Sequence, residues 1–389
     1  MGSILGIPTN VFVLGLVSLF MDISSEMIYP LIPIFLSDVL QAQKTYIGLI
    51  EGIAEGTASI LKVFSGWLSD RIGKRKKIIF WGYGISVFSR PILATATSWV
   101  HVLIYRFTDR VGKGVRTSPR DAIIADSTDK STLGKAFGFH RSMDTLGAVI
   151  GPSLAFAMLG IFGGNLTSVF WLSIVPGLFA LCLIIFFVKE IKVNANASMP
   201  KITFKGLDRN YKAFLFIVAL FTLGKTSEVF LVLRSQELGV PVTSIPLLYL
   251  SFNIVSALLS TPSGIIADRI GKRKTIIASY VLFSLIFLGF AMATSQIHAW
   301  LLFLSYGLFV AMNEGVQRAY VGTIIKPEFK ATGYGVYHTV VGLSALPSGL
   351  IGGLLWQNIG SHALFYYGAF LSILSCILFV SMLFPRNIK

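Results

Sequence analysis

A fifteen-residue segment occurs twice in this chain, and each copy lies between two long apolar runs. The first copy begins at Ser65 and reads SGWLSDRIGKRKKII, and the second begins at Ser263 and reads SGIIADRIGKRKTII. The offset is 198 residues in a chain of 389, so the repeat divides the sequence into two halves. Asp70 to Lys76 is identical to Asp268 to Lys274. A half-length repeat of charged loops between apolar segments is typical of duplicated membrane proteins.

The composition favours a bilayer as the solvent. Hydrophobic residues make up 54% of the chain and charged residues 13%, and the mean hydropathy is +0.74, whereas a soluble domain carries about 25% charged residues. Apolar runs of about 20 residues are long enough to cross a membrane. They predict an all-α membrane protein with twelve transmembrane helices in two pseudo-symmetric six-helix halves. The predicted helices cover residues 10–36, 45–68, 77–97, 100–124, 134–160, 167–189, 211–235, 244–267, 275–294, 298–324, 331–355 and 362–384. The fourth and tenth are the least hydrophobic of them.

Loop charge predicts how these helices are oriented. Lysines and arginines gather in alternate loops, after the second, sixth, eighth and tenth predicted helices and at the C-terminal end. The positive-inside rule therefore places both termini in the cytoplasm. A basic linker at 191–210 is expected to join an N-terminal half, 1–190, to a C-terminal half, 211–389. Because the net charge of +15 is largely this topology signal, we expect membrane lipid and no nucleic acid as a partner.

The repeated loop resembles the signature G-x-L-a-D-r-x-G-r-k of the major facilitator superfamily, and the predicted spans resemble that family along the whole length. The resemblance implies that this loop latches the two halves on the cytoplasmic side. The alternative is that the loop serves only as a signal for orientation in the membrane. The residues expected in the latch are Gly66, Asp70, Arg71, Gly73, Lys74, Arg75, Asp268, Arg269, Gly271 and Lys272. Gly73 and Gly271 allow a tight turn at a helix end.

Three other segments carry weaker resemblances. DISSEMIYPLIPIFL and RTSPRDAIIADS look like parts of a bacterial group of facilitator proteins that has no settled substrate. Gly147, Gly151 and Pro152 resemble the G-x-x-x-G-P motif of proton antiporters, and the match is partial. Packing of small residues and a proline kink explain the same three residues without any antiport.

Ionisable residues inside the predicted spans are the candidate site residues, because charge at membrane depth is costly unless it faces a cavity or a partner. Asp22 and Glu26 lie four residues apart in the first span and are the expected proton carriers. The resemblance implies that spans one, four, seven and ten line a central cavity. The residues expected to form the substrate cavity are Arg106, Arg110, Lys225, Glu228, Glu314, Arg318, His140 and His338. Two alternatives remain: charges near span ends are often interfacial, and the histidines are also suited to hydrogen bonding in the core.

The resemblance implies a secondary transporter that works by alternating access, and not an enzyme. The nucleotide-binding pattern G-x-x-x-x-G-K-[ST] does not occur, so we expect coupling to an ion gradient, with protons favoured by the buried carboxylates. With one candidate histidine in each half, His140 and His338, we expect no metal centre, and we expect no cofactor. The arginines favour a small polar or anionic solute. Alternatives are proton-antiport efflux of hydrophobic or cationic compounds and, more weakly, carriage of an iron-chelating carboxylate siderophore. We expect a monomer in a bacterial inner membrane.

Overall fold

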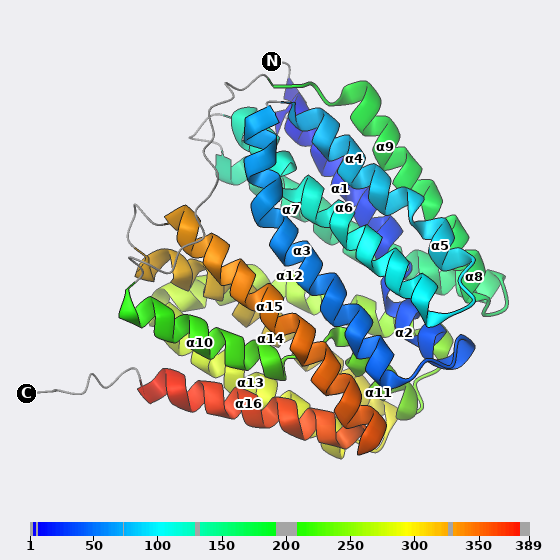
Figure 1. Ribbon diagram of the computed structural model, residues 1–389, viewed down its shortest axis with the longest axis vertical. Helices are drawn as coiled ribbons and strands as arrows, with labels where there is room; N and C mark the ends of the chain where they lie inside the picture. Colours follow the sequence, from blue (N-terminus) through cyan, green and yellow to red (C-terminus); the bar gives the residue numbers. More distant parts are fainter. Residues whose placement is uncertain are drawn as a thin grey trace, which may run out of the picture. The chain divides into compact units, whose positions relative to one another are not determined.

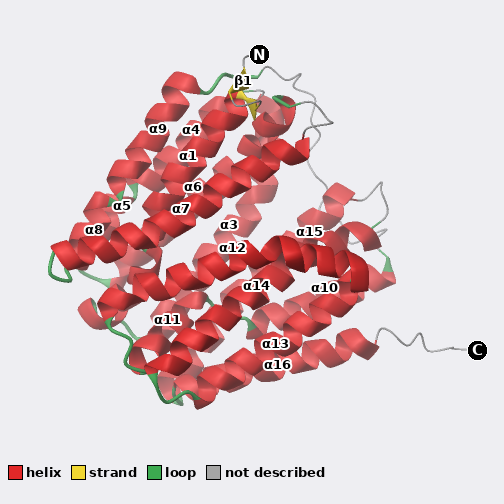
Figure 2. Cartoon of the chain, turned by 180° about the vertical axis from the view of Figure 1, so that it is seen from behind, coloured by secondary structure: helices red, strands yellow, loops and turns green. Residues whose placement is uncertain are grey.

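The computed structural model describes residues 3–4, 7–72, 74–128, 133–191, 208–325 and 330–381. Helices make up nearly all of this part of the chain (Figure 2). Two short strands, β1 (Ser3–Ile4) and β2 (Ile7–Pro8), pair as an antiparallel hairpin before the first helix. The predicted all-helical class is therefore confirmed for the described residues, and the hairpin is a small addition to it.

The chain forms two compact units. The first unit comprises residues 1–42, 57–200 and 242–250, and the second comprises residues 43–56, 201–241 and 251–389. Two helices, α3 (Lys44–Ile72) and α12 (Ile245–Ile270), contribute residues to both units. The domain boundaries expected from the sequence repeat stay a prediction.

Each unit is built from helices that follow the predicted apolar runs (Figure 1). The helices of the first unit are α1 (Thr9–Glu26), η1 (Tyr29–Leu31), α2 (Ile32–Ile34), η2 (Phe35–Val39), α4 (Arg75–Phe88), α5 (Arg90–Ala94), α6 (Trp99–Asp126), α7 (Leu133–Ile161), α8 (Leu166–Leu172), α9 (Ile174–Phe187) and η4 (Val242–Ser244). The helices of the second unit are α10 (Arg209–Gly224), α11 (Glu228–Glu237), α13 (Lys272–Met292), α14 (Gln296–Ile324), α15 (Lys330–Asn358) and α16 (Ser361–Ser381).

Nine helical stretches among the described residues are long and apolar enough to cross a membrane, with mean hydropathies from 1.3 to 2.6. The predicted spans at 45–68, 77–97 and 100–124 are not among them. The last of these corresponds to α6, whose 28 residues include eight charged side chains that lower its hydropathy. The tenth predicted span, which also looked weak, does meet the requirement as α14. The total of twelve spans stays a prediction.

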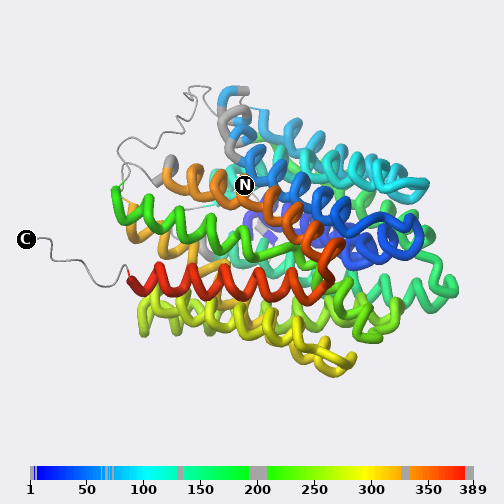
Figure 3. Tube along the Cα trace, turned by 60° about the horizontal axis from the view of Figure 1, so that its bottom comes forward, coloured from blue at the N-terminus to red at the C-terminus, as the bar shows by residue number. Residues whose placement is uncertain are grey.

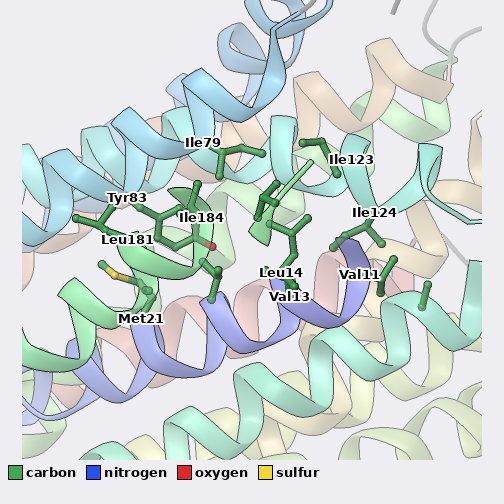
Figure 4. Packing of buried hydrophobic residues seen from close by; sticks show 14 of the residues in the cluster. Val11, Val13, Leu14, Met21, Ile79, Tyr83, Ile123, Ile124, Leu181 and Ile184 are labelled. Atoms are coloured by element: carbon green, nitrogen blue, oxygen red, sulfur yellow. The ribbon is translucent and has the colours of Figure 1, made fainter. Parts of the chain in front are cut away.

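The core of the first unit lies between α1, α4, α6 and α9. Apolar side chains on one face of α1 meet those of α4 and α9, as Figure 4 shows. The cluster is fully or nearly fully buried, and its labelled members are Val11, Val13, Leu14, Met21, Ile79, Tyr83, Ile123, Ile124, Leu181 and Ile184. This packing fixes α1 in the unit and so positions the polar residues on its other face.

Aromatic rings make the core of the second unit. Phe221 of α10 stacks on Tyr280 of α13 with ring centroids 3.9 Å apart. Phe290 of α13 stacks on Phe365 of α16 at 5.3 Å, and these two helices run alongside each other (Figure 3). Such pairs contribute about 0.5–1.5 kcal/mol each beyond the area they bury.

Arg234 of α11 ties together the ends of three helices in the second unit. Its guanidinium donates to the carbonyls of Phe290 at 3.1 Å and Ala293 at 2.9 Å, at the end of α13. It also donates to Ser361 Oγ at the start of α16, at 3.2 Å. Carbonyls at the end of a helix have no partner within the helix, so the arginine satisfies groups that would otherwise need water.

Candidate functional site

A pair of buried arginines lies on α6. Arg106 is 2% exposed and Arg110 is 8% exposed, and one helical turn separates them. Their guanidinium carbons lie 5.1 and 5.9 Å from the centroid of the Tyr29 ring, within the range of a cation–π interaction. The Tyr29 ring in turn meets the ring of Tyr249 edge to face at 5.6 Å. The structure therefore brings two predicted site residues together beside two tyrosines that the sequence did not single out.

Asp109 lies among arginines in the same region. It is 7% exposed, and Arg110, Arg116, Arg90 and Arg106 all act on it electrostatically. Arg116 is held in place by a 2.8 Å hydrogen bond to Ser86 Oγ and lies 4.3 Å from the centroid of the Tyr83 ring. Four guanidinium groups and one carboxylate thus make up this cluster, which we name the arginine cluster: Arg90, Arg106, Asp109, Arg110 and Arg116. Its charge is net positive.

Arg90, Asp109 and Arg116 of the arginine cluster were not assigned to the site from the sequence, and Arg90 is the most deeply buried of the three. Its side chain is fully buried, and its Nη1 donates to the carbonyl of Ser173 at 2.7 Å. Ser173 separates α8 from α9, just as Ser89 separates α4 from α5. Arg90 therefore satisfies a carbonyl at a helix junction. An arginine inside an apolar run, directly before Pro91, was the available signal.

Asp22 and Glu26 lie on the face of α1 that packs against α7. A Cβ atom at Gly147 would lie 2.7 Å from the Cβ of Asp22, and one at Gly151 would lie 2.8 Å from the Cβ of Glu26. The partial antiporter motif and the acidic pair, which were separate in the sequence analysis, therefore meet at one interface. The glycines allow α7 to approach α1 at the level of both carboxyl groups.

The same interface contains a buried histidine. His140 of α7 is 4% exposed, and its Nε2 lies 2.8 Å from the hydroxyl of Ser18 on α1. Its Nδ1 lies 3.6 Å from Asp144 Oδ2, one turn further along α7. Residue numbers rise together along both helices, because Ser18 faces His140, Asp22 faces Gly147 and Glu26 faces Gly151. The helices α1 and α7 are therefore parallel neighbours.

In the second unit, Lys225 lies in a break between two helices, and Glu228 begins the second of these helices. The helix α10 ends at Gly224 and α11 begins at Glu228, so three residues between them are not helical. Lys225 Nζ lies 4.0 Å from Glu314 Oε1 of α14 and 5.7 Å from the Phe309 ring centroid. The hydroxyl of Tyr306 donates to Glu228 Oε1 at 3.2 Å. Three predicted site residues are therefore brought together here.

Polar side chains satisfy the backbone at this break. Ser227 caps α11 by accepting from the amide of Val229 at 3.4 Å, and its hydroxyl donates to Glu51 Oε2 at 3.4 Å. The side chain of Ser348 donates to the carbonyl of Lys225 at 3.4 Å. Glu51 is 1% exposed, so a buried carboxylate from α3 contributes to this region of the second unit.

The two remaining predicted site residues lie apart from these contacts. Arg318 is exposed, and its Nε donates to the carbonyl of Glu314 in its own helix at 3.2 Å. His338 is half-buried beside the ring of Tyr337. The buried polar residue in this region is Gln317, which donates to Tyr280 Oη at 3.0 Å and accepts from Tyr337 Oη at 2.8 Å. The sequence analysis did not assign this residue to the site.

Comparison with known proteins places the chain in a family. A model of the Major Facilitator Superfamily matches residues 14–233 and 213–389. The chain belongs to the major facilitator superfamily. An uncharacterized MFS-type transporter of Methanocaldococcus jannaschii is 38% identical over 379 residues, which cover 95% of this chain and 94% of that protein. The resemblance inferred from the repeated loop is confirmed, and so is the expectation of a membrane transport protein that is not an enzyme.

Solved structures share the facilitator fold at low sequence identity. A POT family transporter in complex with 5-aminolevulinic acid has a TM-score of 0.83 at 12% identity and covers 98% of this chain and 96% of its own. The nucleoside transporter NupG has a TM-score of 0.79 at 15% identity, with 97% and 100% covered. The human organic anion transporter MFSD10 has a TM-score of 0.68 at 18% identity, with 95% and 99% covered.

Part of the facilitator signature loop is visible. Arg75 is buried and forms an ion pair with Asp126 of α6, within the first unit. In the second copy, Lys272 Nζ lies 2.6 Å from Asp268 Oδ1, one turn away in the same loop. Gly271 has a φ of +103°, the left-handed backbone expected at this turn.

The remaining latch residues divide into two groups. Arg71, Lys74 and Arg269 are exposed. Gly73 and the side-chain surroundings of Gly66 and Asp70 lie outside the described residues. A latch between the two halves therefore stays a prediction for the whole set.

Proposed function

We propose that this facilitator protein is a secondary transporter that moves a small polar or anionic solute by alternating access, coupled to protons. The single observation that carries the choice of solute is the buried pair Arg106 and Arg110 beside Tyr29. A guanidinium group binds carboxylate or phosphate oxygens in two parallel hydrogen bonds. Both guanidinium groups lie beside the same tyrosine ring, so two such cations are held close together.

The charge of the arginine cluster supports the same choice. Arg90, Arg106, Arg110 and Arg116 surround one carboxylate, that of Asp109. Buried charge is costly unless it is compensated, so an anionic ligand would bring negative charge to the place where positive charge is concentrated. An iron-chelating carboxylate siderophore is one member of this chemical class.

Proton coupling is assigned to Asp22 and Glu26. Both side chains are half-buried on the α7 side of α1, and Lys113, Arg116 and Arg120 act electrostatically on Asp22. A carboxylate near such cations changes its proton affinity when they move or when an anion neutralises them. Binding of the solute and binding of a proton are linked in this way.

The loop charges support a topology with both termini in the cytoplasm.

The test is ligand stabilisation of the purified protein in lipid nanodiscs. Small carboxylates, phosphate esters, ferric carboxylate chelates and lipophilic cations are compared by the shift in melting temperature, because a ligand at 100 times its Kd stabilises by about 2.7 kcal/mol. We expect stabilisation by one of the anions. Arg110→Ala removes this stabilisation. Arg110→Lys raises the Kd of the anion at least tenfold, because lysine cannot form the two parallel hydrogen bonds. The matched control is Arg141→Ala, an exposed arginine of α7, which leaves it unchanged.

A second function, efflux of hydrophobic or cationic compounds by proton antiport, has two observations in its favour. Gly147 and Gly151 pack against the acidic pair of α1, as the partial antiporter motif suggested. The multi-drug resistance efflux pump PmrA of Streptococcus pneumoniae is 26% identical over 152 residues, 39% of this chain and 38% of that protein. Stabilisation by lipophilic cations alone, abolished by Asp22→Asn and unaffected by Arg110→Ala, would reverse the proposal in favour of this function.

A further inference from the structure

A hydrogen-bonded chain of polar groups lies between α1, α6 and α7 in the first unit. The transport function proposed above uses Asp22 and the arginine cluster and gives these hydrogen-bonded groups no role. Arg120 Nη1 lies 3.3 Å from Ser18 Oγ, and the same hydroxyl lies 2.8 Å from His140 Nε2. Asp144 follows at 3.6 Å from His140 Nδ1. Ser18 and His140 are 2% and 4% exposed, so the centre of the chain is closed to solvent.

The contact with Arg120 favours one arrangement of protons in the neutral state. The guanidinium of Arg120 can only donate, so the Ser18 hydroxyl accepts from it, and we assign the hydroxyl's own proton to the contact with His140 Nε2. The imidazole then carries its proton on Nδ1, which points toward Asp144. Arg120 is itself held by Asp121 at 2.9 Å. Because arginine does not release its proton, its part is to orient the serine.

One group in the chain is left with an unused acceptor. The Oδ1 atom of Asp144 is buried and accepts no hydrogen bond from the described residues. A buried carboxylate oxygen without a donor is costly. Asp22 and Asp144 also repel each other electrostatically. A proton bound in this place offsets the negative charge from which both costs arise.

We propose that Ser18, His140 and Asp144 form a proton-binding relay at the interface of α1 and α7. A proton that arrives adds to His140 Nε2, and the Ser18 hydroxyl turns from donor to acceptor. The imidazolium then forms an ion pair with the Asp144 carboxylate, or passes its Nδ1 proton to that carboxylate and returns to the neutral state. One proton is taken up in either case, and only N–H and O–H bonds form or break.

The charges around the relay come from all three helices. The groups that act electrostatically on His140 are Arg120 and Asp121 of α6 and Arg141 and Asp144 of α7. Asp22 of α1 is in turn acted on by Asp144 and by Lys113, Arg116 and Arg120 of α6. Arg120 and Asp121 pair with each other. A change in the distance between α6 and α7 therefore changes the proton affinity of the relay. Its part in coupling rests on the transport function proposed above, whereas proton binding by itself does not.

The test is nuclear magnetic resonance of the full-length protein in nanodiscs, with isotope-labelled histidine. The chain has five histidines, and His140→Gln assigns the signal of interest. We expect a neutral form with the proton on Nδ1 and conversion to the charged form as the pH falls. Asp144→Asn should lower the ratio of charged to neutral His140 at a fixed pH at least tenfold. The exposed neighbour Arg141 provides the matched control, because Arg141→Gln should change that ratio less than threefold.

Two variants keep the result independent of misfolding. Ser18→Ala should shift the Nε2 resonance, whereas Ser18→Thr, which keeps the hydroxyl, should restore it. A proton on Nε2 in the neutral state, or a charged fraction that is indifferent to Asp144→Asn, would overturn the relay. Because the titration needs no solute, a relay that titrates as expected while no anion binds would overturn the proposed solute and leave the relay in place.

Discussion

Gly147→Ala is the most direct test of the packing that positions Asp22 and Glu26. The added methyl group would lie 2.7 Å from the Cβ of Asp22 and 2.8 Å from the carbonyl oxygen of Leu19. Gly151→Ala would place a methyl group 2.8 Å from both the Cβ of Glu26 and the carbonyl oxygen of Ile23. Two of these neighbours are backbone atoms, which cannot move aside by changing a side-chain rotamer.

The expected cost follows from these distances. Carbon atoms pack at about 3.5–4.0 Å, so α1 and α7 must separate by roughly 0.7–1 Å to admit one methyl group. A gap of that size forfeits a quarter to a half of the attraction between the atoms that line it. Overpacking of this kind costs about 1–3 kcal/mol, and the better helix propensity of alanine returns up to about 1 kcal/mol. We expect each variant to lose about 1–2 kcal/mol of stability.

The assay is thermal unfolding of the purified protein in nanodiscs. The matched control is Gly160→Ala, on the same helix, where a Cβ would meet nothing within 4 Å. That variant should be neutral or more stable, so its Tm should stay the same or rise, whereas the Tm of Gly147→Ala should fall. The double variant with Gly151→Ala should cost less than the sum of its parts, because the first methyl group already separates the helices.

Two outcomes would refute this reasoning. A Gly147→Ala protein that unfolds at the same temperature as Gly160→Ala would show that α1 and α7 are not in close contact at this level. Strictly additive losses in the double variant would show that the two glycines act at independent sites and not on one helix pair.

Two further predictions concern the second unit, and unfolding in nanodiscs measures both. Arg234→Ala should cost about 2–4 kcal/mol because it leaves carbonyls at the end of α13 without their charged donor, whereas Glu237→Gln, which removes only the partly exposed ion pair at 3.1 Å, should cost under about 1 kcal/mol; equal losses would contradict the capping role. Gly271→Ala should lower the free energy of unfolding by about 1–3 kcal/mol, because Gly271 has a φ of +103° that alanine rarely adopts. Gly264→Ala is the control and should be neutral, because Gly264 has equally open surroundings and no positive φ. A neutral Gly271→Ala would contradict the left-handed turn.

The helices were predictable because apolar length is the dominant signal in a membrane protein. The family was predictable because the repeated loop combines glycines and charges at fixed spacing. The breaks within helices were not predictable, since the residues at Ser89, Ser173 and Lys225–Ser227 sit inside apolar runs that read as continuous. A serine can satisfy its own backbone in a helix or outside it, so its presence does not decide between the two.

Within the candidate site, periodicity predicted which residues share a helix face and failed to predict their partners. Arg106 and Arg110, four residues apart, do lie together. Asp144 could have paired with the nearby Arg141, yet it lies 3.6 Å from His140 while Arg141 is exposed. The pairing depends on which face of α7 meets α1, and that is set by Gly147 and Gly151, whose effect on register no local pattern reveals.

The contacts of the polar residues of α1 therefore depend on the small residues of α7. Ser18, Asp22 and Glu26 recur every fourth residue on one face of α1, and the Gly147–Gly151 segment of α7 lets that face come close. The 2.8 Å contact between Ser18 and His140 exists only at this helix separation, because an added 0.7–1 Å would take it beyond hydrogen-bonding distance. Packing and proton binding thus depend on the same interface, so a movement of α1 against α7 during transport would change the proton affinity of His140 without any change in sequence or ligand.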